Sequence, residues 1–164
     1  MSKIKLDSFK CEIEVPGEID YKYEGEQDSL ILYGLKFGIK NKALIYLPVL
    51  ISEVVVSSLH GVKRAGVCYV VESNSGKKII RTMISKGHSE FVATYVKGHE
   101  ETHALIEAGG KSYLEKILKE NNLAGKLFKN AKFSSNCSQE DIADVGGQLA
   151  LYLSYGEAGL KLNL

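Results

Sequence analysis

Residues 97–105, KGHEETHAL, contain two histidines four positions apart, with a glutamate directly after the first. They belong to a run, residues 91–106, that we expect to form a helix with Ser89 as its N-cap and two consecutive glycines at its end. On a helix, residues four apart share one face. His99 and His103 therefore project together, and their imidazole nitrogens can reach one metal ion.

Glu100 is rotated away from the two histidines, where it can act on a water molecule instead of binding the metal. This is the geometry of the H-E-x-x-H motif, which supplies two zinc ligands and a general base from one helical turn. A simpler interpretation stays open, because a histidine on an apolar helix face is usually a hydrogen-bonded core residue. The motif alone favours a metal site without establishing one.

A third ligand is needed, because catalytic zinc usually takes three protein ligands and keeps one position for water. Glu107 is not expected to be that ligand, since three side chains in a line along one helix cannot surround a tetrahedral ion. The run SQEDIADVGGQLALYL, residues 138–153, is the better source. There Glu140 can supply a carboxylate, and Asp144, one turn later, can accept a hydrogen bond that sets the tautomer of a ligand histidine. For Glu140 alone, an acidic first turn that complements the helix dipole is the alternative.

Composition limits the classes of function. The chain has 164 residues, 45% of them hydrophobic and 25% charged, with a formal net charge of +1, so no basic surface suggests nucleic acid. Its three cysteines, Cys11, Cys68 and Cys137, form no C-x-x-C pair, which favours a reducing compartment. There is no signal-peptide pattern at the start, and the most hydrophobic run, residues 43–59, is interrupted and too short to span a bilayer. We therefore expect a cytoplasmic protein that binds neither nucleic acid nor membrane.

The remaining patterns indicate an α+β or mixed α/β fold. We expect an α+β domain in which a twisted mixed sheet carries a backing helix, the H-E-x-x-H helix and a C-terminal glutamate helix. Residues 1–164 are expected to form one domain, with residues 1–28 as a candidate N-terminal extension. A shorter helix, capped by Ser112, is expected between the two site helices. The other expected elements are a strand at 30–40, a strand at 43–47, the backing helix at 49–62, and a hairpin of 67–72 with 78–84.

The stretches HEETHAL and EDIADVGGQLA together resemble the zincin metallopeptidases of the gluzincin type, in which H-E-x-x-H is followed by a glutamate in an E-x-x-A-D context. The likeness is greatest to the compact ImmA-type regulatory peptidases and the minigluzincins, and it covers about residues 89–155. It implies a bound zinc ion and a peptide or protein substrate that pairs, as an added strand, with the strand inside residues 78–84. Carried over by position, it implies the zinc ligands His99, His103 and Glu140, the general base and acid Glu100, and Asp144 beside a ligand.

Two features depart from the thermolysin-like enzymes of this group. Thirty-six residues separate His103 from Glu140, and no histidine follows His103. The histidine that stabilises the oxyanion in those enzymes thus has no counterpart. Its candidate replacements are Tyr113, Tyr152 and Tyr155, each of which is more simply explained by packing.

The leading hypothesis is a zinc-dependent peptidase that hydrolyses peptide bonds through a metal-activated water, with an activity that could be latent. In the latent form, residues 1–28 would cover the cleft and the Cys11 thiolate would take the fourth zinc position, although an ordinary thiol is the simpler expectation. The alternative is a weakly active or inactive metal-binding regulatory module of the zincin fold. A third is a structural domain with the histidines in its core. Glu101, next to the general base, is expected to be merely solvated.

Overall fold

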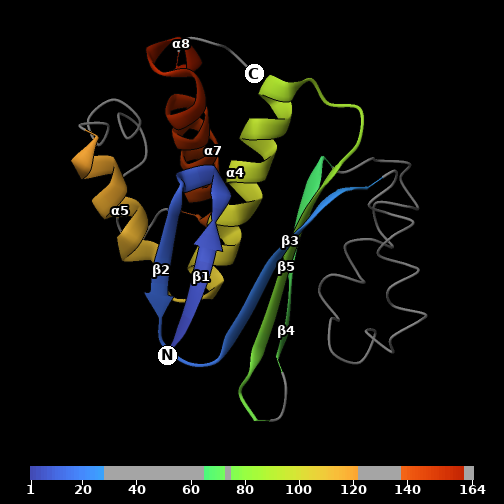
Figure 1. The fold of residues 1–164 in the computed structure, drawn as a ribbon, viewed down its shortest axis with the longest axis vertical. Helices are drawn as coiled ribbons and strands as arrows, with labels where there is room; N and C mark the ends of the chain where they lie inside the picture. Colours follow the sequence, from blue (N-terminus) through green and yellow to red (C-terminus); the bar gives the residue numbers. More distant parts are fainter. Residues whose placement is uncertain (28–64, 73–74, 122–137, 161–164) are drawn as a thin grey trace.

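The computed structural model describes residues 1–27, 65–72, 75–121 and 138–160 (Figure 1). Its elements confirm the expected α+β class; no helix in these ranges is both long enough and apolar enough to cross a membrane. The predictions for residues 30–62 lie outside the described ranges. In chain order the elements are β1 (Ser2–Leu6), a 3-10 turn (Asp7–Phe9), β2 (Cys11–Val15), β3 (Ile19–Gln27), β4 (Gly66–Glu72), β5 (Lys78–Ser85), α4 (Glu90–Glu107), α5 (Lys111–Glu120), α7 (Gln139–Tyr155) and α8 (Glu157–Leu160).

Strands β3, β5 and β4 form a mixed three-stranded sheet with β5 at its centre. β5 pairs in parallel with β3 and antiparallel with β4, so the predicted hairpin is confirmed. The central position of β5 corrects the expectation that this strand pairs with a peptide substrate. Both of its hydrogen-bonding edges are already occupied by neighbouring strands.

The first 27 residues form three strands and contribute to the core. β1 and β2 pair as an antiparallel hairpin, and β3 joins the mixed sheet. Charged and apolar residues alternate along β1 and β2, which gives each strand one inward face. The buried side chains of this N-terminal hairpin and its 3-10 turn are Ile4, Leu6, Phe9, Ile13 and Val15.

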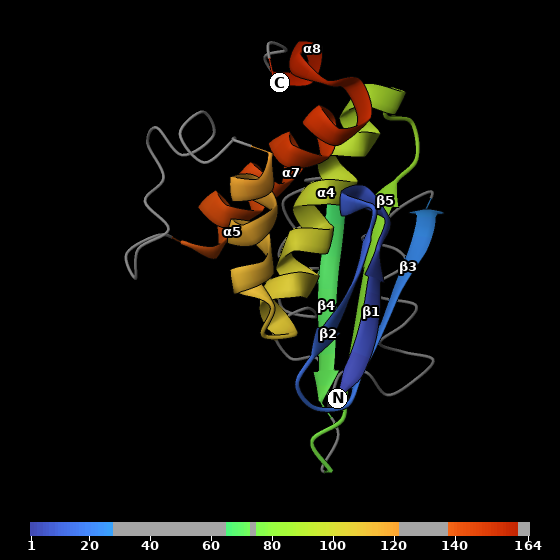
Figure 2. The same cartoon turned by 60° about the vertical axis from the view of Figure 1, so that its left-hand side comes forward.

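Helix α4 lies between the mixed sheet and α7, with contacts to β4 and β5 on one side and to α7 on the other (Figures 1 and 2). Both site helices begin where predicted. The Ser89 hydroxyl accepts a hydrogen bond from Val92 N at 3.3 Å, and the Ser138 hydroxyl accepts one from Asp141 N at 3.1 Å. The predicted cap at Ser112 is wrong, because α5 begins at Lys111, its N-cap is Gly110, and no side chain caps it.

Small residues let α4 and α7 approach closely. A Cβ on Gly98 of α4 would lie 2.5 Å from Ala150 Cβ, and one on Gly146 of α7 would overlap the side chain of Thr102. Real Cβ atoms do not pack at such distances, so the crossing needs glycine at both positions. Gly146 on α7 and Gly98 on α4 therefore face one another across the contact between the helices. The two helices run antiparallel, which places the start of α7 beside the end of α4.

Glu101 is only 1% exposed, so the expectation of a solvated side chain is wrong. Its Oε1 accepts hydrogen bonds from the Ser8 amide at 3.1 Å and the Ser8 hydroxyl at 2.7 Å, and its Oε2 accepts one from the Tyr21 hydroxyl at 2.8 Å. Burial raises the pKa of Glu101 above its ordinary value. These bonds connect the N-terminal hairpin and β3 to α4, a partnership between segments about 90 residues apart.

Candidate metal centre

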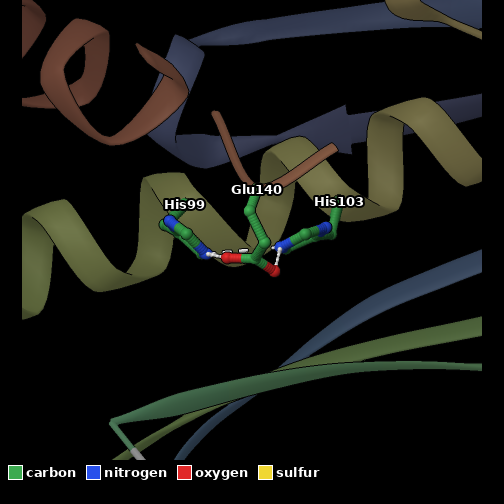
Figure 3. A group of neighbouring side chains, drawn as sticks. All are labelled: His99, His103 and Glu140. Carbon is green, nitrogen blue, oxygen red and sulfur yellow. Dashed lines mark hydrogen bonds and ion pairs between the residues drawn. The ribbon is translucent and has the colours of Figure 1, made fainter. Parts of the chain in front are cut away.

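Two side chains of α4 and one of α7 point toward one another (Figure 3). His99 and His103 lie one turn apart on α4, and Glu140 lies in the first turn of α7. One potential donor atom from each residue lies within 4.8 Å of the others, and in the described ranges this is the group suited to hold a metal ion. The three residues predicted as ligands are thus brought together.

The Glu140 carboxylate lies between the two imidazoles (Figure 3). Its Oε1 is 2.9 Å from His103 Nε2, and its Oε2 is 3.2 Å from His99 Nε2. The two Nε2 atoms are 3.2 Å apart. Donors at about 2.0–2.1 Å from a tetrahedral zinc ion would be about 3.4 Å from one another. The two Nε2 atoms therefore have nearly the separation that such an ion requires, and each faces a different oxygen of the Glu140 carboxylate.

The other nitrogen of each imidazole is held by α7. His99 Nδ1 lies 3.0 Å from Asp144 Oδ1, and His103 Nδ1 lies 2.7 Å from Gln139 Oε1. Both partner oxygens are acceptors, so Nδ1 carries the proton in the neutral imidazole and Nε2 keeps its lone pair. Asp144 has the place predicted for it. Gln139 was missed, although its position directly before Glu140 in the same turn was the signal that could have suggested it.

The charges at the site favour a cation. With both Nδ1 atoms protonated, two lone pairs and a carboxylate face one point, an arrangement that needs either a bound cation or additional protons. The side chains of His99 and His103 are only 16% and 12% exposed, whereas that of Glu140 is 71% exposed. An ion can therefore reach the imidazoles from the side of Glu140. The residues present fit a divalent metal ion.

Glu100 lies on the side of α4 that faces the sheet. It is 9% exposed, and a Cβ on Gly66 of β4 would lie 2.8 Å from its Cγ and 3.2 Å from its Oε1. Cys68, on the same strand, has a pKa raised well above its ordinary value, by burial first and then by the negative charges of Glu100 and Glu107. Glu100 is therefore beside β4 and outside the group of candidate ligands, one residue along the helix from His99.

Two other residues considered from the sequence lie outside the ligand group. Glu107 accepts a hydrogen bond from Gln139 Nε2 at 3.4 Å, and its exclusion as a ligand agrees with the geometry. Cys11 lies on β2, where burial and then the nearby charge of Glu101 raise the pKa of its thiol. The structure does not place the Cys11 thiol at the metal position, and the N-terminal hairpin that carries it belongs to the core.

Two of the three tyrosines considered as replacements for the missing histidine lie away from the candidate ligands. Tyr152 and Tyr155 are more than three helical turns beyond Glu140 on α7, and a helix rises about 5.4 Å per turn. Tyr113 packs against the core from α5. Tyr152 and Tyr155 are therefore too far away to take the place of the missing histidine.

No protein-family model, curated protein or solved structure matches this chain. The resemblance to the gluzincin peptidases therefore stays a prediction, carried by the residues of the site and their arrangement.

Proposed function

We propose that this chain is a zinc-dependent peptidase. The observation that carries the proposal is the convergence of His99 Nε2, His103 Nε2 and the Glu140 carboxylate on one point, with both Nδ1 atoms held by acceptors. Two imidazoles and one carboxylate are a donor set found in catalytic zinc sites, where the fourth position stays open.

Each side chain around the ion would have a separate role. A bound zinc ion would supply Lewis acidity, which lowers the pKa of a water molecule and polarises a peptide carbonyl. Glu100 would accept a proton from the attacking water and return it to the leaving amine. Its low exposure and its place between α4 and β4 would limit the positions its carboxylate can take. Asp144 and Gln139 would hold the ligand imidazoles in the tautomer that binds metal.

The substrate class and the compartment belong to the same proposal. A peptide or protein substrate follows from the resemblance to peptidases. The cytoplasm suits the cysteines, since Cys11 and Cys68 are both free and a reducing compartment keeps thiols in that state.

The test compares the wild-type chain with Glu100→Gln, both purified without chelator. Metal analysis should find one zinc per chain in each, and it also distinguishes zinc from iron, which the same donor set binds. Digestion of a peptide library, read by mass spectrometry, should show cleavage by the wild type that falls by about 100-fold or more in the variant. Glu90→Gln, at an exposed position in the first turn of the same helix, is the matched control and should cleave normally.

Two results would contradict the proposal. Wild-type protein that holds no zinc and takes up none on titration would contradict the proposed metal site. Cleavage that is unchanged in Glu100→Gln would contradict the proposed role of Glu100 as the general base.

A metal-binding regulatory module without turnover is the second candidate. It is favoured because no histidine follows His103 in the sequence and because Tyr152 and Tyr155 lie far along α7 from Glu140. This candidate predicts one bound zinc per chain and no cleavage by either the wild type or the variant.

A further inference from the structure

Four side chains spaced by four residues follow the face of α4 that meets the start of α7. They are Tyr95, His99, His103 and Glu107. The inner pair are the candidate ligands. The outer pair lie outside the ligand group, yet each contacts the α7 residue that holds the nearer histidine.

The first outer contact is made by Tyr95. Its hydroxyl donates a hydrogen bond to Asp144 Oδ1 at 3.0 Å, and the same oxygen accepts from His99 Nδ1 at 3.0 Å. The Asp144 side chain is 55% exposed, so a second protein donor limits its rotation toward solvent. The Tyr95 ring is itself seated on α7, because a Cβ on Gly147 would lie 2.7 Å from it. Burial and the hydrogen bond to Asp144 raise the pKa of Tyr95, so its hydroxyl keeps the proton it donates.

The second outer contact is made by Glu107. The Gln139 amide directs its oxygen to His103 Nδ1 at 2.7 Å and its nitrogen to Glu107 Oε1 at 3.4 Å. An amide has an acceptor end and a donor end, so an acceptor at Glu107 determines which end faces the imidazole. A reversed amide would present hydrogens to His103 Nδ1. That would favour the tautomer with its proton on Nε2. Nε2 would then have no lone pair to donate to a metal ion.

We propose that Tyr95 and Glu107 are positioning residues that raise the metal affinity of the site, Tyr95 by orienting Asp144 and Glu107 by orienting Gln139. The inference rests on the metal site of the proposed function and does not depend on catalysis. Removal of groups that orient metal ligands typically lowers metal affinity by about 10–100-fold. Because Tyr95 and Glu107 each act through one further residue, the lower end of that range is expected.

The experiment titrates the full-length chain, stripped of metal, with zinc in competition with a chromophoric chelator. Tyr95→Phe and Glu107→Ala should each weaken zinc binding by about 10-fold. Glu107→Gln keeps an acceptor oxygen at this position and should stay within about 2-fold of the wild type. The matched controls are Tyr152→Phe on α7 and Glu115→Ala on α5, and both should bind zinc as the wild type does.

Two measurements on the metal-free proteins separate positioning from a merely structural role. Thermal unfolding of Tyr95→Phe and Glu107→Ala should match the wild type, because the expected loss is in affinity. Nitrogen-15 NMR of the imidazoles should show the Nδ1–H tautomer at His103 in the wild type, and a loss of it in Glu107→Ala.

Wild-type zinc affinity in both Tyr95→Phe and Glu107→Ala would overturn the inference. A lower unfolding temperature with no change in affinity would also overturn it. If the wild type binds zinc but cleaves no peptide, only the peptidase proposal fails, and the affinities of the variants still decide the inference. If the wild type binds no zinc, both fail.

Discussion

Glu100 and Glu101 are neighbours in the H-E-x-x-H motif, but the fold places them in different surroundings. Successive residues on a helix are rotated by about 100°. Glu100 faces Gly66 of β4, whereas Glu101 faces Ser8 in the turn of the N-terminal hairpin. Glu100, next to a candidate ligand in sequence, is the residue proposed to act in catalysis, whereas Glu101, buried in hydrogen bonds, stabilises the fold.

Gly66→Ala should lower peptidase activity and leave zinc affinity unchanged. The added Cβ would lie 2.7 Å from Val96 Cγ1 and 2.8 Å from Glu100 Cγ, so the Glu100 side chain must move. A small displacement of a catalytic group can cost up to about 100-fold in rate. Peptide cleavage and chelator competition, measured together, check this, with Glu72→Ala at the exposed end of the same strand as control. Full activity in Gly66→Ala would contradict the placement of Glu100.

Glu101→Gln should change how stability depends on pH. Burial raises the pKa of Glu101 above its ordinary value of 4.5, so the folded protein keeps a proton that the unfolded chain has already lost. The free energy of unfolding of the wild type should therefore fall as pH rises from about 4.5 through the folded-state pKa. Glutamine cannot ionise and keeps an oxygen for Ser8, so this part of the decline should disappear.

Urea unfolding at pH values from about 4 to about 8 measures this difference, because that range covers the titration of a glutamate with a raised pKa. EDTA is included so that bound metal does not contribute. Glu101→Gln should be the more stable protein at neutral pH, and the two should converge at acidic pH. Glu12→Gln, at an exposed position on β2, is the control and should follow the wild type. Parallel pH profiles for wild type and Glu101→Gln would count against the buried carboxyl.

At the scale of elements, the site depends on how closely α4 and α7 cross. Ser138 caps α7 at the point that places Glu140 in its first turn. Ser89 caps α4, the helix that carries both histidines. Gly98 and Gly146 then allow the helices to touch, which brings the α7 carboxylates within hydrogen-bond distance of the α4 imidazoles. Helix starts and small residues therefore determine the geometry of the ligands.

Gly146→Ala should weaken both stability and zinc affinity. Its methyl group would overlap the Thr102 side chain, so the helices must separate and carry Glu140 and Asp144 away from the histidines. Overpacking of this kind costs about 1–3 kcal/mol. Chemical denaturation and zinc competition measure the two effects, and adding Thr102→Ala should restore part of each. Ser154→Ala, on the exposed face of α7, is the control. Unchanged zinc affinity in Gly146→Ala would contradict the dependence on helix approach.

At the scale of the whole molecule, the candidate ligands lie on two helices, and 36 residues separate His103 on the first from Glu140 on the second. They converge only when the chain is folded, because α4 must pack between the sheet and α7. The N-terminal hairpin takes part in the same core. Metal binding should therefore be linked to folding of the entire assembly.

Zinc should raise the free energy of unfolding of the wild type. A ligand that binds only the folded state adds about 2.7 kcal/mol at a free concentration of 100 times its Kd. Thermal and urea unfolding, with and without zinc, measure the increase, and EDTA should reverse it. His99→Ala should lose it, while His88→Ala should keep it, since His88 bonds to Ser85 and the Ala65 carbonyl outside the cluster. A stability that zinc leaves unchanged would favour a purely structural domain.

The sequence by itself determined the features that depend on near neighbours. Ser89 and Ser138 mark helix starts because a cap acts within three residues, the β4–β5 hairpin follows from a short polar turn, and the spacing of His99 and His103 places both on one helix face. The helix that carries Glu140 could also be recognised from its E-x-x-A-D pattern.

The tertiary structure alone decided which elements meet. The burial of Glu101, the central place of β5 and the contacts of Tyr95 and Gln139 all join residues distant in the chain. Local patterns carry no record of such partners, because packing free energy depends on groups that approach only in the folded chain.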